Sequence, residues 1–238
     1  KHGAFVMNPA VKYRDNPVIR RDRPWEGNDL HYGAVLYDNH EKLFKMWYTN
    51  THFSATERVP KKLVPTVPKK YSRGVCYAVS KDGLNWEKPS LGLIEFSGST
   101  DNNLVYGLDA SPGRDAHGAT VFKDLGATGD ESYKLVHVGP YEGRFAVFGA
   151  VSPDGLRWRP IEKPLLYDYM CDTQNVVRFD PAKGKYVGYF RGWSAYEKGK
   201  LHGRRTIAYA ETDRFESWPV PETIVSRCQR FDFRRITP

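Results

Sequence analysis

A short element recurs three times along the chain, and each copy directly precedes an apolar, strand-like run. The element reads Asp-x-His or Asp-x-Gln, and it occurs at Asp29–His31, Asp115–His117 and Asp172–Gln174. A second motif, Ser-x-Asp-Gly-x-x-Trp, follows in the same phase at Ser80–Trp86 and Ser152–Trp158, with a degenerate copy ending at Trp218. Repeats of this size, with several short strands in each, are typical of radially repeated sheets such as propeller blades.

The composition favours the same architecture. Among 238 residues there are 21 Gly, 16 Pro and 15 Tyr, which fits many short strands joined by tight turns. No stretch keeps a helical apolar period for three turns without Gly or Pro interrupting it. We therefore predict an all-β fold, a β-propeller of four-stranded antiparallel blades of the five-bladed type, with about three blades present.

The repeat divides the chain into units. We expect a single, partial β-propeller domain over residues 1–238, with blade units at about 28–100, 101–166 and 167–226. In each unit the Trp of the second motif is expected on the outer, fourth strand. Because an open array leaves bare sheet edges, we expect the missing blades to come from the same longer chain or from a partner chain. The segment at 230–233 is a candidate start for a fourth unit.

The distribution of charge and the lengths of the apolar runs indicate which partners the chain can bind. The formal net charge is +8, but much of the excess lies in a Pro-punctuated segment at 58–73 and in the tail at 227–235. Because these basic residues are not interleaved with aromatic ones, solvated loops are favoured over a nucleic-acid site. No apolar run approaches the roughly 18 residues of a membrane span, so no membrane partner is expected.

The cysteines and the N-terminus bear on the compartment. Cys76, Cys171 and Cys228 form an odd set without a Cys-x-x-Cys pair, so neither a zinc finger nor a disulfide framework is supported. Cys171 is expected to be a buried, inert thiol. Since the chain starts at Lys1 and not at Met, a signal peptide could have been removed. A secreted or periplasmic location is slightly favoured over the cytoplasm.

The repeated acids are the candidate site. In a propeller, residues just before each innermost strand meet at one mouth of the central channel, so Asp29, Asp115 and Asp172 should converge there. Acids that share a pocket repel one another, so one stays ionised while another keeps its proton. An acid and base pair of this kind cleaves glycosidic bonds. The sequence therefore predicts that these carboxylates cleave a glycosidic bond of a sugar.

Polar and aromatic neighbours would complete this pocket. His31, His117 and Gln174 follow the acids by two residues and should point the same way in extended backbone. The remaining candidates could stack on a sugar ring or bind its hydroxyl or carboxylate groups, and they are Trp25, Tyr32, Arg114, Tyr169, Arg191 and Trp193.

Other interpretations stay open. A repeated Asp before a strand can simply cap a turn, as we expect for the Asp-Gly motifs. Asp and His from three blades could also hold a divalent cation in the channel, although no tighter ligand spacing supports a metal and no other cofactor is expected. The pocket could belong to a non-catalytic carbohydrate-binding propeller, and a propeller can also serve as a protein-interaction platform.

Several of these motifs resemble a known family. Asn28-Asp29, Arg114-Asp115 and the Ser-x-Asp-Gly-x-x-Trp turns resemble those of the five-bladed β-propeller glycosidases, the invertase/fructosidase and arabinanase/xylosidase superfamily. The nearest likeness is to bacterial fructosidase-branch proteins of undefined substrate. The resemblance implies a glycoside hydrolase that cleaves a terminal glycosidic bond in an oligosaccharide or glycoside.

The resemblance also implies roles for the acids. Asp29 would be the nucleophile of a retaining enzyme or the general base of an inverting one, and Asp115 would orient the substrate. The family has a Glu as the general acid where this chain has Asp172. Glu142 and Glu197 are the reserve candidates for that role.

Overall fold

The computed structural model describes residues 9–52, 73–108, 115–142, 144–167, 169, 171–197 and 200–223. These residues form three four-stranded antiparallel sheets and two short 3-10 helices, with no α-helix among them. Nowhere in this described part is there a helix with the length and apolar character needed to cross a bilayer. The predicted all-β class is therefore confirmed.

Each sheet takes its four strands consecutively from the chain, so that every strand pairs with its sequence neighbours. The first sheet consists of β1 (Asp29–Asp38), β2 (Leu43–Thr51), β3 (Arg73–Ser80) and β4 (Leu104–Gly107). The second consists of β5 (His117–Lys123), β6 (Tyr133–Tyr141), β7 (Arg144–Ser152) and β8 (Arg159–Pro160). The third consists of β9 (Val176–Asp180), β10 (Lys185–Glu197), β11 (Lys200–Thr212) and β12 (Glu222–Thr223). Helix η1 (Pro24–Glu26) precedes β1, and η2 (Gly129–Glu131) precedes β6. This arrangement is consistent with propeller blades.

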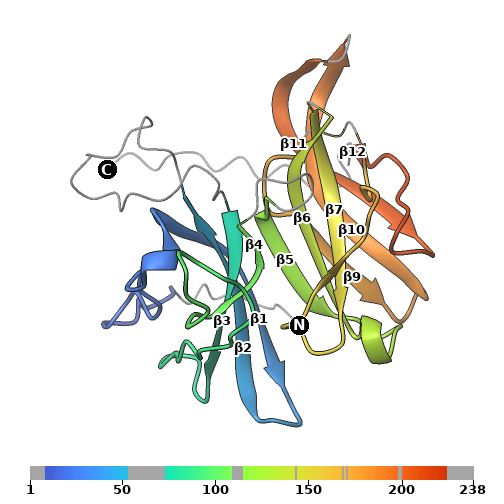
Figure 1. Ribbon diagram of the computed structural model, residues 1–238. Helices are drawn as coiled ribbons and strands as arrows, with labels where there is room; N and C mark the ends of the chain where they lie inside the picture. The colour runs from blue at the N-terminus through green and yellow to red at the C-terminus, as the bar shows by residue number, and fades with distance from the viewer. Residues whose placement is uncertain are drawn as a thin grey trace, which may run out of the picture.

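The sheets pack face to face around their innermost strands, and β5 contacts both β1 and β9 (Figure 1). Alternate residues of a strand point to opposite faces, so the middle sheet contributes to two cores. Trp47 and Leu135 belong to the core shared by the first and second sheets. Val136 and Phe190 belong to the core shared by the second and third.

The Asp-Gly motifs form the same turn twice. The Ser80 hydroxyl oxygen accepts the N–H of Gly83 at 2.9 Å, and the Asp82 carboxylate accepts the N–H groups of Leu84 and Asn85 at 2.8 Å each. Residues 152–157 repeat these bonds at the same distances. Gly83 and Gly155 have φ values of 74° and 77°, a left-handed conformation that glycine adopts without strain. The interpretation of these acids as turn caps is confirmed.

The outer strand of the first sheet differs from the prediction. β4 begins at Leu104, so the first sheet extends beyond the expected unit boundary at residue 100. The segment after Trp86 makes only an isolated bridge between Val79 and Glu87. Placing the tryptophan of the motif on the fourth strand was wrong in all three sheets, because Trp86, Trp158 and Trp218 lie before β4, β8 and β12. The pairing of β3 with β4 is irregular, with a register shift between Val75 and Cys76, and the Asn103 side chain donates to the Tyr77 carbonyl at 2.6 Å.

The third sheet has a longer hairpin than the second. β10 and β11 stay paired as far as Glu197 and Lys200, and in Figure 1 this hairpin projects beyond the other sheets. His202 pairs with Ala195 on this ribbon.

Candidate functional site

Histidines from the first two sheets meet at one end of the innermost strands. The ring centroids of His31 and His117 are 6.2 Å apart, and the ring of Tyr32 lies 4.6 Å from the first and 5.5 Å from the second. We call the end of the sheets where β1 and β5 begin the mouth. This contact places His31 of the first Asp-x-His element beside His117 of the second.

Bulges in both inner strands shape the mouth. The pairing of β1 with β2 shifts between His31 and Gly33, where Tyr32 has a φ of 49°. The pairing of β5 with β6 shifts after His117, where Gly118 has a φ of 62°. A β-bulge redirects the side chains beside it and is frequent next to active sites. The two histidines thus face each other because the same irregularity occurs in both sheets.

Asp115 is held by an arginine that the sequence reasoning missed. Arg73, the first residue of β3, places its Nη1 atom 2.8 Å from the nearly buried Asp115 carboxylate. Arg73 follows a long connection and lies outside the repeated motifs, so no sequence signal linked it to Asp115. The contact joins the first sheet to the segment that leads into the second.

Both mouth histidines are disfavoured as cations. Burial lowers the pKa of His117, and the nearby Arg73 charge lowers that pKa further. Burial also lowers the pKa of His31, although the neighbouring Asp29 carboxylate opposes this. At neutral pH both rings are therefore uncharged and can donate or accept hydrogen bonds.

Asp29 is the most exposed of the three repeated acids. Its carboxylate lies 3.6 Å from Nδ1 of His31, whose Nε2 atom lies 3.4 Å from the Thr51 hydroxyl. Asp29 is the first residue of β1 and is exposed to solvent. A carboxylate in this position can approach a bound molecule without first breaking an ion pair.

Asp172 brings the third unit to the mouth. The Asp172 backbone lies near the His117 ring, where it raises the pKa of that histidine against the larger effect of burial. The Arg191 guanidinium binds both the Asp172 carboxylate and its carbonyl oxygen. Arg191 is itself fixed, because its carbonyl accepts the Tyr169 hydroxyl at 3.0 Å. Asp172 is therefore ordered by an arginine, as Asp115 is.

Gln174 ties the innermost strands together. Its Nε2 atom donates to the carbonyl oxygens of Gly33 on β1 and Ala119 on β5, each at 3.2 Å. One side chain ahead of β9 thus bonds the inner strands of the other two sheets. The predicted substrate-binding role competes with this scaffold role for the same amide nitrogen.

The aromatic candidates have different surroundings. The Trp25 indole N–H donates to the Asn103 side chain at 2.6 Å, and Trp25 packs on the outer face of the first sheet. Trp193, on β10, has the Arg205 guanidinium 6.0 Å from its ring centre.

Arg114 lies outside the described residues, and so does the Glu197 side chain. Glu142 accepts a hydrogen bond from the Tyr167 hydroxyl at 3.2 Å.

The described residues contain no group of three His, Cys, Asp or Glu side chains arranged to hold a metal ion. Two of the acids considered for such a site instead bind Arg73 and Arg191. Cys171 is buried, and burial raises the pKa of its thiol to about 12. The expectation that Cys171 is buried is therefore confirmed.

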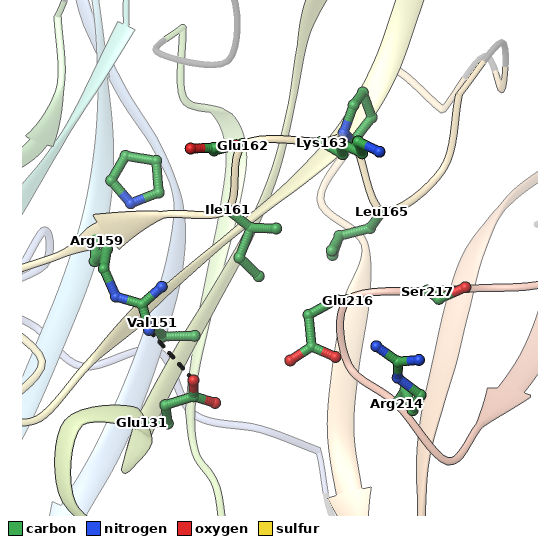
Figure 2. A pocket seen from close by; sticks show the side chains of 12 residues that line it. Glu131, Val151, Arg159, Ile161, Glu162, Lys163, Leu165, Arg214, Glu216 and Ser217 are labelled. Carbon is green, nitrogen blue, oxygen red and sulfur yellow. Dashed lines mark hydrogen bonds and ion pairs between the residues drawn. The ribbon is translucent and has the colours of Figure 1, made fainter.

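A groove lies elsewhere, at the rim between the second and third sheets. Its volume is about 770 Å³, and its lining includes three acidic and three basic side chains (Figure 2). They are Glu131, Arg159, Glu162, Lys163, Arg214 and Glu216. Figure 2 shows the ion pair between Arg159 and Glu131, which is 3.3 Å long. The groove is formed by outer strands and loops, away from the repeated Asp-x-His elements.

No protein-family model and no curated protein matches the chain. Solved structures do match it. One is an N-acetylgalactosamine deacetylase from F. plautii in complex with blood group B trisaccharide, with a TM-score of 0.56, 14% identity, and coverage of 88% of this chain and 55% of that one. Another is a protein assigned as a glycoside hydrolase from Bacteroides ovatus, with a TM-score of 0.55, 16% identity, and coverage of 90% and 59%.

The chain thus spans 55% and 59% of the length of these two structures. At such low identity the likeness shows a shared fold and nothing finer. The all-β, blade-like fold expected from the glycosidase resemblance is therefore supported. Assignment to the fructosidase branch rests on the short sequence motifs alone.

Proposed function

We propose that the protein is a glycoside hydrolase-like enzyme that cleaves a terminal glycosidic bond at the mouth. The observation that carries the proposal is the meeting of the three repeated elements, in which His31 contacts His117 and the Gln174 amide bonds the inner strands of the other two sheets. The fold shared with a glycoside hydrolase and with a trisaccharide-bound deacetylase supports a carbohydrate substrate.

The acids take different roles in this proposal. Asp29 is exposed and lies beside a neutral histidine, which suits a nucleophile or general base. Asp115, fixed by Arg73, orients the sugar. The Arg191 contact occupies the Asp172 carboxylate, so the proton donor is another residue, with Glu142 and Glu197 as candidates. Membership of the fructosidase branch, on the motifs at Asp29 and Asp115, is part of the proposal.

A second candidate is a carbohydrate-binding propeller without catalysis. The observation in its favour is that two of the three repeated acids are engaged by arginines. Carboxylates fixed in this way are suited to accept hydrogen bonds from sugar hydroxyl groups. The two candidates differ in whether a bound sugar is cleaved.

The test uses the intact protein and a panel of aryl glycosides and natural oligosaccharides. Asp29→Asn should fold normally and keep sugar binding, while turnover falls by about a hundredfold or more. Asp130→Asn, which changes an acid of η2 outside the mouth, is the matched control and should keep full turnover. Unchanged turnover in Asp29→Asn would exclude Asp29 as the nucleophile or base. Sugar binding without any turnover by the unmodified protein would establish the second candidate instead.

A further inference from the structure

One buried acid near the start of β1 has no part in the proposed reaction. Glu26, the last residue of η1, is completely buried, and its carboxylate oxygens accept four hydrogen bonds. One oxygen accepts the N–H groups of Asp22 and Arg23 at 2.8 and 3.0 Å. The other accepts the Tyr48 hydroxyl at 2.7 Å and the Lys88 ammonium group. A carboxylate that is both buried and bonded on all sides fixes the backbone that carries it.

The two residues between Glu26 and Asp29 are tied to the neighbouring strand. The Asn28 N–H donates to the Thr51 carbonyl of β2 at 2.7 Å, and Gly27 forms a parallel bridge to the same residue. A Cβ atom added at Gly27, whose φ is 66°, would lie 2.3 Å from that carbonyl oxygen. The backbone that leads from the buried carboxylate to Asp29 is therefore fixed at each residue.

The Asp29 side chain depends on this backbone more than the other two repeated acids do on theirs. Asp115 and Asp172 each bind an arginine. Within the described part of the chain, the ion pair of Asp29 is with His31, at 3.6 Å, and no lysine or arginine pairs with it. The place of Asp29 at the mouth is therefore set by the segment that Glu26 holds.

We propose that Glu26 is a positioning residue whose ion pair with Lys88 holds Asp29 at the mouth. The Lys88 side chain, on the segment after β3, is only 7% exposed, and it also donates to the Arg20 carbonyl at 2.6 Å. A buried carboxylate that loses its cation is strongly destabilised, so η1 would move toward water and shift Asp29 with it. The effect on turnover rests on the proposed function, whereas the contact of Asp29 with His31 can be tested without any turnover.

The pKa of His31, measured by NMR titration of the intact protein, reports whether Asp29 is in place. Burial lowers this pKa and the Asp29 carboxylate opposes that effect, while the Arg73 charge, which also lowers it, is the same in all variants. Lys88→Met removes a positive charge, which by itself would raise the pKa of His31, whereas loss of the Asp29 contact would lower it. We expect a lower pKa, by at least about half of the decrease that Asp29→Asn produces.

Lys45→Met is the matched control. Lys45 is another nearly buried lysine, with a side chain 8% exposed, and it binds Asp38 and Glu41 at the opposite end of β1. Because this ion pair has no connection to the segment before β1, Lys45→Met should leave the pKa of His31 unchanged.

Glu26→Gln is a second variant, which keeps the test decisive if Lys88→Met fails to fold. It retains the size of the side chain and removes the ion pair. Glu26→Gln should lower the pKa of His31 in the unmodified background and leave it unchanged in the Asp29→Asn background. A direct effect of the Glu26 charge on His31 would instead persist in both backgrounds.

An unchanged or higher pKa of His31 in Lys88→Met, or an equal decrease in Lys45→Met, would overturn the proposal. On a glycoside that the unmodified protein cleaves, Lys88→Met should also lower kcat by about tenfold or more and change KM by less than about twofold, because misplacing a reacting group slows the chemical step. An unchanged kcat would overturn the positioning role. If the unmodified protein cleaves no glycoside, the proposed function fails, and the titration of His31 still decides whether Glu26 holds Asp29.

Discussion

Substituting Gly155, which contacts Trp47 of the first sheet, tests how the first two sheets pack. A Cβ atom added at Gly155 would lie 2.7 Å from Cζ2 of Trp47, whereas one added at Gly83 would lie no closer than 3.8 Å to its nearest neighbour, Phe44. Both glycines occupy the same turn, with φ values of 77° and 74°. Gly83→Ala therefore reproduces the backbone strain of Gly155→Ala without its clash, and it is a matched control.

The expected losses of unfolding free energy in the two variants follow from this difference in contacts. A left-handed alanine costs about 1–2 kcal/mol at either position. Overpacking against a buried ring adds about 1–3 kcal/mol at Gly155 only. Denaturant unfolding of the intact protein should therefore show that Gly155→Ala lowers the free energy of unfolding more than Gly83→Ala does. Equal losses in the two variants would refute the packing of this turn on Trp47.

A double mutant cycle makes the test specific. Trp47→Phe removes the indole N–H and leaves the Gly155 carbonyl without its donor, which should cost about 1–3 kcal/mol for that polar group. The smaller ring also leaves room for a methyl group at Gly155. The cost of Gly155→Ala should therefore be smaller in Trp47→Phe than in the unmodified protein. Strictly additive losses would contradict this reasoning.

Three further predictions concern the mouth and the core behind it. Burial lowers the pKa of His137 to about 4. When the pH falls, this histidine therefore takes up a proton in the unfolded chain at a higher pH than in the folded protein. Stability should then fall by up to about 3 kcal/mol between pH 6.5 and pH 4, and His137→Gln should flatten that part of the unfolding profile. Arg73→Gln should raise the pKa of His117 in an NMR titration, because it removes a cation that lowers this pKa, whereas Lys42→Gln, at an exposed turn, should not. Gln174→Ala should cost about 1 kcal/mol in unfolding free energy through its lost bonds to two strands.

Strand positions were predictable where short local patterns decide them. The repeated elements indicated the innermost strands β1, β5 and β9, and the Asp-Gly motifs indicated two turns, because both patterns act within a few residues. The outer strand of the first sheet was not predictable in this way. Its pairing with β3 includes a register shift and a bond from the Asn103 side chain to the distant Tyr77 carbonyl, and no local sequence pattern indicates either.

The candidate site was predictable in part for the same reason. The repeat indicated that His31 and His117 would meet, since equivalent positions of adjacent blades lie side by side. The partners of the acids were harder to predict, because Arg73 lies outside the repeat and its contact with Asp115 is long-range. Gln174 was expected to face a ligand, but whether its amide reaches strands of other sheets depends on how closely those sheets pack.

The bulges show why the mouth could not be derived from the motif alone. Gly118 adopts its left-handed conformation without strain, and a side chain there would meet the Thr173 carbonyl at 2.5 Å. Tyr32 adopts a similar φ of 49° with a bulky side chain, a conformation that costs on the order of 1–3 kcal/mol. Since the Tyr32 ring contacts both His31 and His117, the strained residue is the one that joins the two histidines. The packing between sheets must supply the energy that holds it there, so the mouth depends on the whole assembly of sheets and on more than its own residues.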